Sequence, residues 1–528
     1  MELLYQILRS PWYCVSSILV CLLYAVYLKI RPLHVDKSVP RVEGFSFPIL
    51  GYLPHVIKHW HEWPSECMRL CRLFKKTWGG PLPNFGGLPG AYFYIHQEPQ
   101  INYVLSNVDL FIKGDIWDNV LGELLGQGIF AVDGDKWKKH RKLMSNLFSR
   151  NLMRHNATVT RNKLLQVVRQ LQKKIIAGDA DAGVDVDIQD VFFRLMFDIT
   201  SSVTFGTDLD SVGEEKQHYF ARAFDEISFL CQQRFLDPLF LIKRYWQVGT
   251  RERRIRQLKH VIDSFVDELI NDRRINLDLV KMDILSTYIE SANKSGELIT
   301  NDDLRDIVMN VLLAGRDTTA CALSWTWYEL SKNPLIVARI IKEVAEVCGK
   351  NTHDNNENHD NEQNENGAAH DQKYTFENMN KLRYTHSVAL EVIRLHPPVP
   401  SDPRFATQNC TLPDGTRVPA GAGIDVCIMA VGRNEEIWGH DASEFRPERF
   451  LNEKEPSPFK YPMFNAGPRM CLGRSLALMN MKLAMSILLP LFEFQDKLGH
   501  DGEYKWTLVE SMKGGFPVHV TERKASGI

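Results

Sequence analysis

The sequence predicts a mainly α-helical protein, and three of its features lead to this prediction. Apolar residues recur at helical spacing through residues 155–275, and no long stretch alternates as a strand does. A second periodic segment runs from Thr300 to Lys332, which corresponds to about 48 Å of helix. A third periodic segment, over residues 476–487, ends before Pro490. We therefore expect helices to form most of the fold.

Charge and cysteine content exclude several classes of protein. The chain has 528 residues and a net charge of −2, so no basic field indicates that it binds nucleic acid. Its 10 cysteines are scattered and do not form a disulfide framework. Cys67 and Cys71 have no second pair at the spacing of a zinc site. A reducing, cytosol-facing compartment fits this pattern.

The N-terminus carries a segment typical of membrane anchors. Trp12 to Leu28 is an uncharged, mostly apolar run of 17 residues, about 26 Å as a helix, against about 27 Å for the bilayer core of the endoplasmic reticulum. A cleaved signal peptide is the alternative, but charges and prolines follow directly and no small-x-small site does. The cations after the run place the remainder in the cytosol. We predict a transmembrane anchor over residues 1–31, a proline-containing linker over 32–54 and a folded domain over 55–528.

Two features precede the central part of the chain. Residues 91–95 predict a short strand that ends before Glu98-Pro99. Trp137 and Arg141 stand four residues apart and therefore share one face of a helix. Taken by themselves, they could also be a core tryptophan and an ordinary surface arginine with no shared function. The opposite face is basic, and it is either an ordinary solvated surface or a patch for an acidic protein partner; its residues are Lys138, Lys139 and Lys142.

The segment that begins at Thr300 carries its own start and stop signals. Thr300 can cap the helix with Asp303, and Asn333-Pro334 ends it. Its centre is Ala314-Gly315-Arg316-Asp317-Thr318-Thr319, where small residues let a flat ligand lie against the helix. The Thr318 hydroxyl can donate to the carbonyl of Ala314, four residues back, and open the helix locally. Small and hydroxyl residues also occur at ordinary helix contacts, so the pattern needs support from elsewhere.

Residues 350–373 break the periodic pattern. The segment consists largely of Asn, Glu, Asp and His, and it has no apolar residue before Ala368. Such a segment cannot bury enough apolar surface to order itself, so we predict a flexible insert. Metal binding by His353, His359 and His370 is the alternative to a plain solvated loop.

Charged residues in the next part of the chain are spaced for pairing. Glu391 and Arg394 lie three residues apart on an amphipathic helix that ends at His396-Pro397, so their side chains can pair. Phe445-Arg446-Pro447-Glu448-Arg449-Phe450 then brings a further arginine.

The most informative stretch is Phe464-Asn465-Ala466-Gly467-Pro468-Arg469-Met470-Cys471-Leu472-Gly473-Arg474. It carries one cysteine into the start of a helix, where the helix dipole and free N–H groups favour a thiolate. Gly467 and Gly473 allow a close approach of the backbone to a flat ligand, and Arg469 supplies a cation for a carboxylate. These properties suit a loop that presents a thiolate to haem iron and pairs a haem propionate. A buried structural cysteine is the alternative, which we keep for the other nine.

This loop matches Phe-x-x-Gly-x-Arg-x-Cys-x-Gly at every position and resembles the haem-binding loop of the cytochrome P-450 superfamily. The resemblance extends in the expected order to Trp137-x-x-x-Arg141, the Thr318 helix, Glu391-x-x-Arg394 and Phe445 to Phe450. It implies one large, mostly helical domain with a small β-rich side. It further implies haem b with Cys471 as the iron ligand, a charge triad of Glu391, Arg394 and Arg449, and a set of haem contacts: Trp137, Arg141, Arg404, Phe464, Gly467, Arg469 and Gly473.

The resemblance also implies a reaction, in which dioxygen and two electrons from NADPH hydroxylate a hydrophobic substrate. The electrons come through NADPH–cytochrome P-450 reductase, and Asp317 and Thr318 help to deliver protons. Residues 128–134 resemble the fatty-acid terminal hydroxylases of microbial and plant type, as does the Pro397-Pro398-Val399-Pro400 run. One branch of such hydroxylases esterifies haem through a Glu where this chain has Ala314. The implied substrate-pocket residues are Ile129, Phe130, Leu313, Ala314, Val399 and Phe516.

Three alternatives to fatty-acid hydroxylation remain at this point. The first is hydroxylation of a sterol, terpene or other specialised metabolite. The second is a haem-thiolate isomerase or dehydratase that needs neither oxygen nor reductase, although such relatives usually alter the oxygen-helix threonine or the cysteine loop. The third is a haem sensor without catalysis, against which the Asp317-Thr318 pair argues.

Overall fold

A computed structural model describes the chain over a set of ranges: residues 32–42, 50–83, 89–145, 148–177, 183–214, 217–237, 239–275, 283–296, 298–349, 373–451, 454–505 and 507–524. The predicted anchor, residues 43–49 of the linker and residues 350–372 of the predicted insert lie outside these ranges. Within them, no helix has both the length and the apolar character that crossing a membrane requires.

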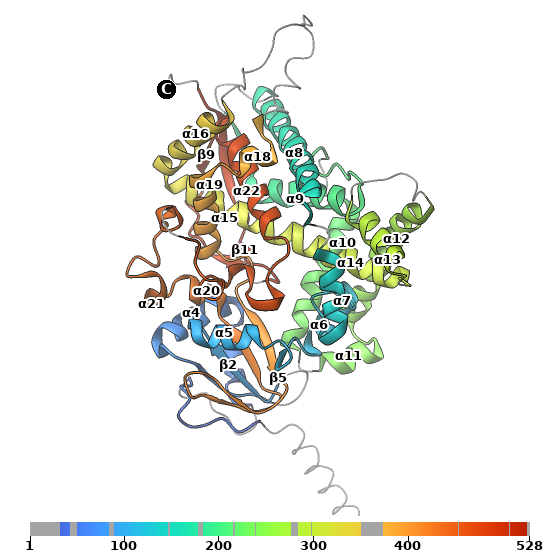
Figure 1. The fold of residues 1–528 in the computed structure, drawn as a ribbon, viewed down its shortest axis with the longest axis vertical. Helices are drawn as coiled ribbons and strands as arrows, with labels where there is room; N and C mark the ends of the chain where they lie inside the picture. Colours follow the sequence, from blue (N-terminus) through green and yellow to red (C-terminus); the bar gives the residue numbers. More distant parts are fainter. Residues whose placement is uncertain are drawn as a thin grey trace, which may run out of the picture.

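Helices make up most of the described structure (Figure 1). The α-helices are α3 (Leu53–Lys58), α4 (Trp63–Phe74), α5 (Glu98–Ser106), α6 (Ile116–Leu125), α7 (Gly134–Ser145), α8 (Arg150–Ala177), α9 (Ile188–Phe205), α10 (Tyr219–Gln232), α11 (Phe240–Trp246), α12 (Thr250–Ile275), α13 (Ile284–Ser295), α14 (Asn301–Leu312), α15 (Thr318–Lys332), α16 (Pro334–Cys348), α18 (Phe376–Met379), α19 (Arg383–Leu395), α20 (Ile428–Gly432), α21 (Glu435–Trp438) and α22 (Arg474–Leu488). The 3-10 turns are η1 (Trp60–Glu62), η3 (Gln233–Leu236), η5 (Pro447–Phe450), η6 (Pro462–Phe464) and η7 (Gly467–Arg469), and η4 (Leu313–Asp317) is a π-helical turn.

Within the described ranges, the strands form four small sheets. The five-stranded sheet has the order β1-β2-β8-β5-β3, in which only β2 and β8 run parallel, and it lies with α4 and α5 at the bottom of Figure 1. The other sheets have the orders β4-β12-β9, β10-β11 and β6-β7. The strands are β1 (Trp78–Pro81), β2 (Ala91–Ile95), β3 (Phe111–Ile112), β4 (Val184–Asp187), β5 (Asp402–Ala406), β6 (Cys410–Thr411), β7 (Arg417–Val418), β8 (Gly423–Val426), β9 (Phe492–Asp496), β10 (Tyr504–Lys505), β11 (Ser511–Met512) and β12 (Pro517–Glu522). The prediction of a mainly helical fold with a small β-rich side is confirmed.

One long helical unit crosses the middle of the molecule, formed by α14, the π turn and α15 (Figure 1). It begins and ends where the sequence predicts. Thr300 and Asp303 form a capping box at its start, and Lys332 is its last residue before Asn333. α15 packs against α9, α19 and α22, and its residues from Thr319 to Tyr328 are almost all buried. Only the π turn departs from regular α-helical geometry.

The described part of residues 155–275 is mostly helical, as predicted, but it also contains one strand. α8, α9, α10, α11 and α12 follow one another there, but β4 lies between α8 and α9 and was not predicted. β4 has only four residues, and its partner β12 is close to the C-terminus. A pairing so distant in the sequence leaves little local signal.

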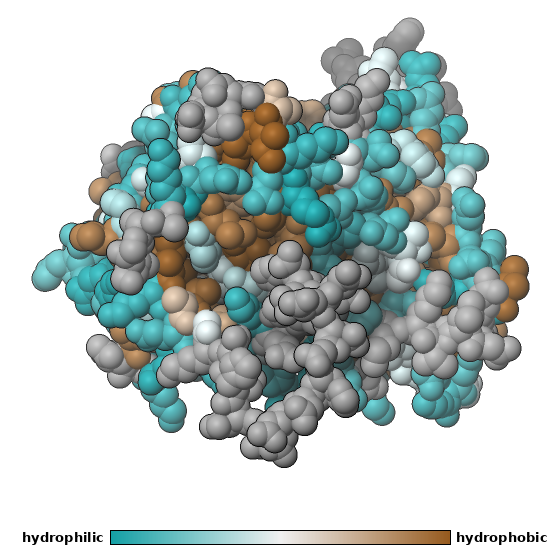
Figure 2. Space-filling model, turned by 90° about the horizontal axis from the view of Figure 1, so that it is seen from above, coloured by the Kyte–Doolittle hydropathy of each residue, from teal (hydrophilic) through white to brown (hydrophobic). Residues whose placement is uncertain are grey.

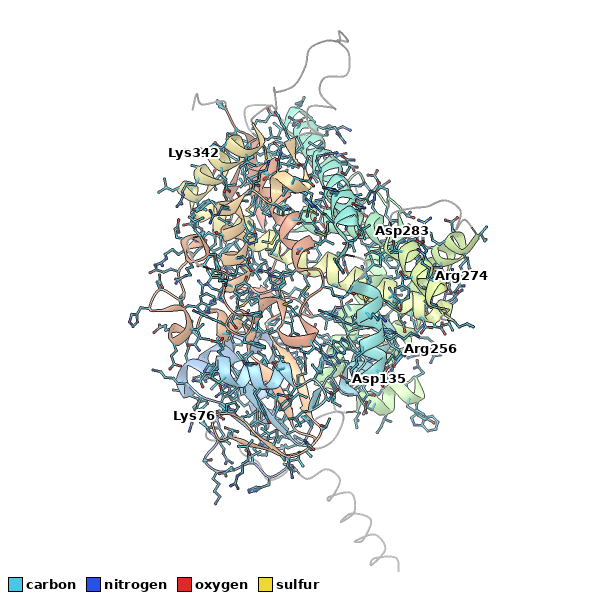
Figure 3. The ribbon with its side chains drawn as sticks, viewed as in Figure 1. Lys76, Asp135, Arg256, Arg274, Asp283 and Lys342 are labelled. Carbon is cyan, nitrogen blue, oxygen red and sulfur yellow. The ribbon has the colours of Figure 1, made fainter. Side chains whose placement is uncertain are left out.

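Polar side chains cover much of the face that Figure 2 shows. Arg256 and Arg274 of α12 are exposed and lie along the outer edge of the molecule (Figure 3). On the face seen from above, polar residues surround an apolar area near the centre, which is hollowed (Figure 2). The main core is continuous through the helical part, and a smaller apolar cluster lies between α4 and the strands β1 and β2.

Candidate active site

The cysteine loop is closed by a backbone hydrogen bond. The N–H of Cys471 donates to the carbonyl of Phe464 at 2.7 Å, so that the two ends of the loop meet in front of α22. Gly467 has a φ of +64°, and a Cβ atom there would come within 2.5 Å of the Leu105 carbonyl oxygen. Both the positive φ and the close approach to α5 therefore require glycine at this position.

The thiol of Cys471 faces a recess inside the protein. Its side chain has exposed surface, yet desolvation by the surrounding protein raises the pKa of the thiol. The N–H groups of Gly473 and Arg474 and the charge of Arg141 act in the opposite direction but are weaker. The N–H groups at the start of α22 thus favour the thiolate, in the direction that the sequence predicts. A Cβ atom on Gly473 would meet only the Cys471 sulfur, at 3.9 Å, so the space beside the sulfur is open.

Basic side chains from three parts of the sequence gather next to this loop. The guanidinium group of Arg469 lies 4.5 Å from the centroid of the buried Trp137 ring. Arg141, one turn further along α7, donates from Nη1 to the carbonyl of Met470 at 2.5 Å. Arg404 on β5 is fully buried. Desolvation lowers the pKa of Arg469 to about 10, and the nearby charge of Arg404 acts in the same direction. The structure thus brings together the four side chains that the resemblance assigns to haem carboxylates.

Two aspartates partly balance this cluster. Asp402 pairs with Arg404 and, at 2.7 Å, with Lys113, and Asp133 pairs with Arg469 at 2.6 Å. Burial lowers the pKa of Lys113 to about 8, so it stays mostly charged at neutral pH. The cluster then holds four cations, which are Lys113, Arg141, Arg404 and Arg469, against two carboxylates.

Two N–H groups of the cluster lack an acceptor. Among the described residues, Nη2 of Arg404 and Nε of Arg469 have no hydrogen-bond partner although both atoms are buried. Unpaired buried donors are costly, and a site with two surplus positive charges favours a ligand that brings carboxylates. A ligand with two carboxylates would supply both the acceptors and the missing charge.

The middle of the long helical unit is open on one side. Leu313, Ala314, Gly315 and Thr318 are half-buried, whereas their neighbours Leu312 and Arg316 are buried. The Thr318 hydroxyl donates to the carbonyl of Ala314 at 2.6 Å, as the sequence predicts. Residues Leu313–Asp317 form the π turn, a distortion that is frequent at functional sites. Like Cys471, this face of the helix keeps accessible surface.

A comparison with protein-family models identifies the family of this chain. The model described as cytochrome P450 matches residues 40–505. The chain belongs to the cytochrome P450 family. The prediction made from the cysteine loop is confirmed, and with it the identification of the protein as a haem-dependent monooxygenase.

Individual members of the family match over almost the full length. Cytochrome P450 704B1 of Arabidopsis thaliana is 33% identical over 92% of this chain and 95% of its own. Cytochrome P450 704C1 of Pinus taeda is 32% identical, with 92% and 93% covered. Cytochrome P450 86B1 of Arabidopsis thaliana is 31% identical, with 91% and 86% covered. The similarity to these plant proteins agrees with the branch that residues 128–134 indicate.

The cytochrome P450 cofactor is haem, and the residues of the site fit it. Cys471 would hold the iron, the open side of Gly473 would accommodate the flat ring, and Arg404 and Arg469 would donate to the propionates. When bound, haem with a thiolate ligand supplies the activation of dioxygen. The protein contributes the cation cluster and the choice of substrate.

The segment before α7 connects the two halves of this cytochrome P450 site. A Cβ atom on Gly128 would lie 2.0 Å from the Asn310 amide, so this glycine allows the segment to approach α14. Asn310 accepts from the N–H of Phe130 at 3.2 Å. At its other end the segment binds the cysteine loop, since Arg469 donates to the carbonyl of Val132 at 3.0 Å. The residues that marked the branch in the sequence therefore hold α14 and the loop together.

Five of the six expected pocket residues have accessible surface. Ile129, Phe130, Leu313 and Ala314 are half-buried, and Val399 is exposed. Phe516 is different: it is 0% exposed, and its ring packs 6.0 Å from the rings of Tyr328 and His500. Its side chain therefore belongs to the core beside α15, where it packs against Tyr328 and His500.

The charge triad is assembled as expected. Arg394 donates to both oxygens of Glu391, at 2.6 and 2.8 Å, and Arg449 donates to Oε1 at 3.3 Å. Glu391 and Arg394 have no exposed surface. The remaining N–H groups of Arg394 bind backbone carbonyls of Gly432 and Ala442. These contacts fix α19 to the segment that leads to the cysteine loop.

Sequence reasoning missed several residues of the site. Asp133 lies in the segment before Trp137 and Asp402 shortly after Pro400, but nothing local shows which arginine each one pairs with. Asn465 donates to Asp402 at 2.8 Å and has a φ of 60°. The sequence also did not reveal a buried carboxyl elsewhere: Glu510 is 0% exposed, and neither carboxyl oxygen has a hydrogen-bond partner among the described residues. Its only sequence signal is an acidic residue between Val509 and Ser511, which is not distinctive.

Proposed function

We propose that this cytochrome P450 hydroxylates long-chain fatty acids at or next to the terminal methyl group. The observation that carries the proposal is the apolar lining beside the π turn. Ile129 and Phe130 come from one segment and Leu313 and Ala314 from another, and Asn310 ties the two segments together. Such a lining offers hydrophobic contact with little directional polarity, which suits an alkyl chain. Each buried methylene contributes about 0.8 kcal/mol, so affinity rises with chain length until the pocket is full.

The proposed roles of the protein side chains follow from their environment. Cys471 is the iron ligand, and Trp137, Arg141, Arg404 and Arg469 hold the propionates. Burial raises the pKa of Asp317 to about 7, so its carboxyl can both hold and release a proton near neutral pH. The Thr318 hydroxyl keeps the helix open at the Ala314 carbonyl. Together, Asp317 and Thr318 supply protons on the substrate side of the haem.

We further propose that the protein is anchored in the endoplasmic reticulum membrane by residues 1–31, with residues 32–54 as linker and 55–528 as the catalytic domain. An exposed apolar surface supports this location. It is formed by α11 and its neighbours, and its members are Phe235, Leu239, Ile242, Tyr245, Trp246 and Val248. Exposed tryptophan and tyrosine next to the cations Lys243 and Arg244 are typical of surfaces that contact lipid headgroups.

The proposed redox partner is NADPH–cytochrome P-450 reductase. The exposed face of α7 carries Lys138, Lys139 and Lys142, and the opposite face of the same helix carries Trp137 and Arg141. A basic surface so close to the haem contacts would attract an acidic reductase. The ordinary solvated face remains the alternative for these lysines, and charge reversal at Lys139 and Lys142 decides between them through the rate of haem reduction.

The test of the substrate proposal uses the full chain with its reductase. The enzyme is incubated with NADPH and saturated and unsaturated fatty acids of graded length, and the products are identified by mass spectrometry. We expect hydroxyl groups at or next to the methyl end, with turnover that rises with chain length and then levels off. Turnover of a sterol or terpene and of no fatty acid would overturn the substrate assignment. Product without NADPH would indicate isomerase or dehydratase chemistry instead.

A further inference from the structure

Arg316 in the π turn is shared by two carboxylates. Its Nη1 atom lies 2.5 Å from Oδ1 of Asp225 and 3.0 Å from Oδ1 of Asp317. Nη2 lies 3.2 Å from the other oxygen of Asp225. The guanidinium group is only 2% exposed, and three aromatic rings surround it at 5.4 to 5.7 Å, those of Phe193, Phe197 and Phe224.

The two carboxylates differ in their access to solvent. Asp317 is buried, next to Thr318. Asp225 lies on α10 and is 45% exposed, and Gln217 donates to it at 2.7 Å. A continuous set of polar contacts therefore runs from the surface of α10 through Arg316 to the carboxyl beside the helix opening.

The charges around Asp317 come from few elements. α9 packs against the π turn and presents the aromatic rings of Phe193 and Phe197 to Arg316. α10 contributes Asp225, and α15 contributes the buried thiol of Cys321, whose pKa burial raises well above its usual value. Glu510 acts on Cys321 from the β10–β11 side. Desolvation is the main reason why the pKa of Asp317 is raised. Of the neighbouring charges, Arg316 lowers this pKa and Asp225 raises it.

We propose that Asp225 is a positioning residue for the hydroxylation reaction: by competing for Arg316, it sets how strongly that guanidinium group holds the Asp317 carboxyl. A guanidinium group stays protonated in proteins and so does not pass the proton on itself. While Asp225 engages Arg316, part of the Asp317 carboxyl population holds a proton at neutral pH and can release it toward Thr318. It then regains a proton from solvent and returns to its starting state. This inference rests on the proposed proton-supplying role of Asp317.

The structure offers a matched control on the same helix. Glu226 follows Asp225 and is 42% exposed. It also makes an ion pair through both carboxylate oxygens, with Arg254 of α12, and both N–O distances are 2.6 Å. Glu226→Gln removes the same kind of pair without touching the π turn. Any effect of Asp225→Asn that Glu226→Gln reproduces comes from loosening α10.

The first measurement needs no turnover. Infrared difference spectra of the resting holoenzyme are recorded as a function of pH, and the Asp317 band is assigned with Asp317→Asn. We expect Asp225→Asn to move the titration of Asp317 down by about one pH unit, because Arg316 then pairs with Asp317 alone. Glu226→Gln should leave the titration unchanged, and Asp225→Glu should restore it. An unchanged titration in Asp225→Asn would overturn the proposal.

The second measurement connects the pair with the reaction. Asp225→Asn should lower the amount of product per NADPH several-fold at neutral pH, and the pH profile of this ratio should move toward acid. In an Arg316→Lys background, Asp225→Asn should have no further effect, since one ammonium group cannot bridge both carboxylates as a guanidinium fork does. An equal further loss in that background would contradict the proposal. If Asp317→Asn leaves the ratio unchanged, the proton role of Asp317 is wrong, whereas the titration still decides the Asp225–Arg316 relationship.

Discussion

The guanidinium group of Arg469 lies over the indole ring of Trp137, with 4.5 Å between the guanidinium carbon and the ring centroid. The contact joins α7 to the cysteine loop from the opposite end of the sequence. Asp133, at the start of the same region, pairs with Arg469 at 2.6 Å. The loop therefore takes its position from α7 as well as from α22, and changes in either should affect the haem.

Arg469→Gln should weaken haem retention. The change removes a charged donor to a carboxylate, an interaction of about 1.5–3 kcal/mol, so haem transfer to an acceptor protein should be faster by roughly tenfold or more. Arg254→Gln is the control, because it also removes an arginine from an ion pair, but from the surface pair with Glu226. Equal rates of haem loss in the two variants would contradict the role of Arg469.

Cys471→Ser should abolish the absorption band that marks thiolate ligation in the reduced carbon monoxide complex. A serine oxygen cannot supply the same electron density to iron. Cys410→Ser, at a half-buried free cysteine on β6, should keep the band. Persistence of the band in Cys471→Ser would eliminate this cysteine as the ligand.

Thr318→Ala should divert reducing equivalents from product to peroxide while haem binding persists. The hydroxyl of Thr318 donates to the carbonyl of Ala314 at 2.6 Å, and Thr326, two turns further on, donates to Ala322 in the same way at 2.7 Å. Thr326→Ala is therefore a control for loss of this bond away from the π turn. We expect the ratio of product to NADPH to fall only in the first variant. A ratio that falls in neither would show that Thr318 is a packing residue.

Glu391→Gln should strongly destabilise the protein. The substitution leaves the guanidinium groups of two buried arginines, Arg394 and Arg449, without their shared carboxylate. Breaking a buried pair costs about 3–5 kcal/mol. Glu377→Gln, which breaks an exposed pair with Arg154, should cost only about 0–1 kcal/mol. The comparison of denaturant midpoints, or of soluble holoenzyme if Glu391→Gln does not fold, checks this ranking.

Glu510 should make stability fall as pH rises. Burial raises the pKa of Glu510 from 4.5 to about 8 in the folded protein. The folded state therefore binds more protons than the unfolded state between these values, and its stability decreases with pH across this window. Glu510→Gln should remove part of this decrease. Unfolding is measured between about pH 5 and pH 8, with the exposed Glu503→Gln as control; parallel curves for Glu510→Gln and the wild type would contradict the prediction.

Local signals in the sequence were sufficient for the main parts of the site. The limits of the long helical unit follow from Thr300 with Asp303 and from Asn333-Pro334, which act on neighbouring residues. The Thr318–Ala314 bond follows from spacing within one helix. Each of these features depends on residues within about one helical turn of one another, so no knowledge of the tertiary structure is required.

Through-space relationships were not predictable in this way. Lys113 and Asp402 come from distant segments, and their pairing depends on β3 and β5 lying side by side in one sheet. Desolvation by the surrounding protein raises the pKa of the Cys471 thiol, and this contribution comes from segments distant in the sequence. The pairing of Arg316 with Asp225 depends on the fold bringing α10 close to the π turn.

The π turn also restricts how this chain can change in length. Each residue of an α-helix rotates the side chains that follow by about 100°. Deleting one residue from Leu313–Asp317 would restore a regular helix, but it would turn α15 relative to α14. Either Asn310 would then lose the carbonyl of Leu125, or the indole of Trp325 would lose the carbonyl of Glu510. The number of residues between Asn310 and Trp325 is thus fixed by their two separate contacts, whatever side chains stand between them.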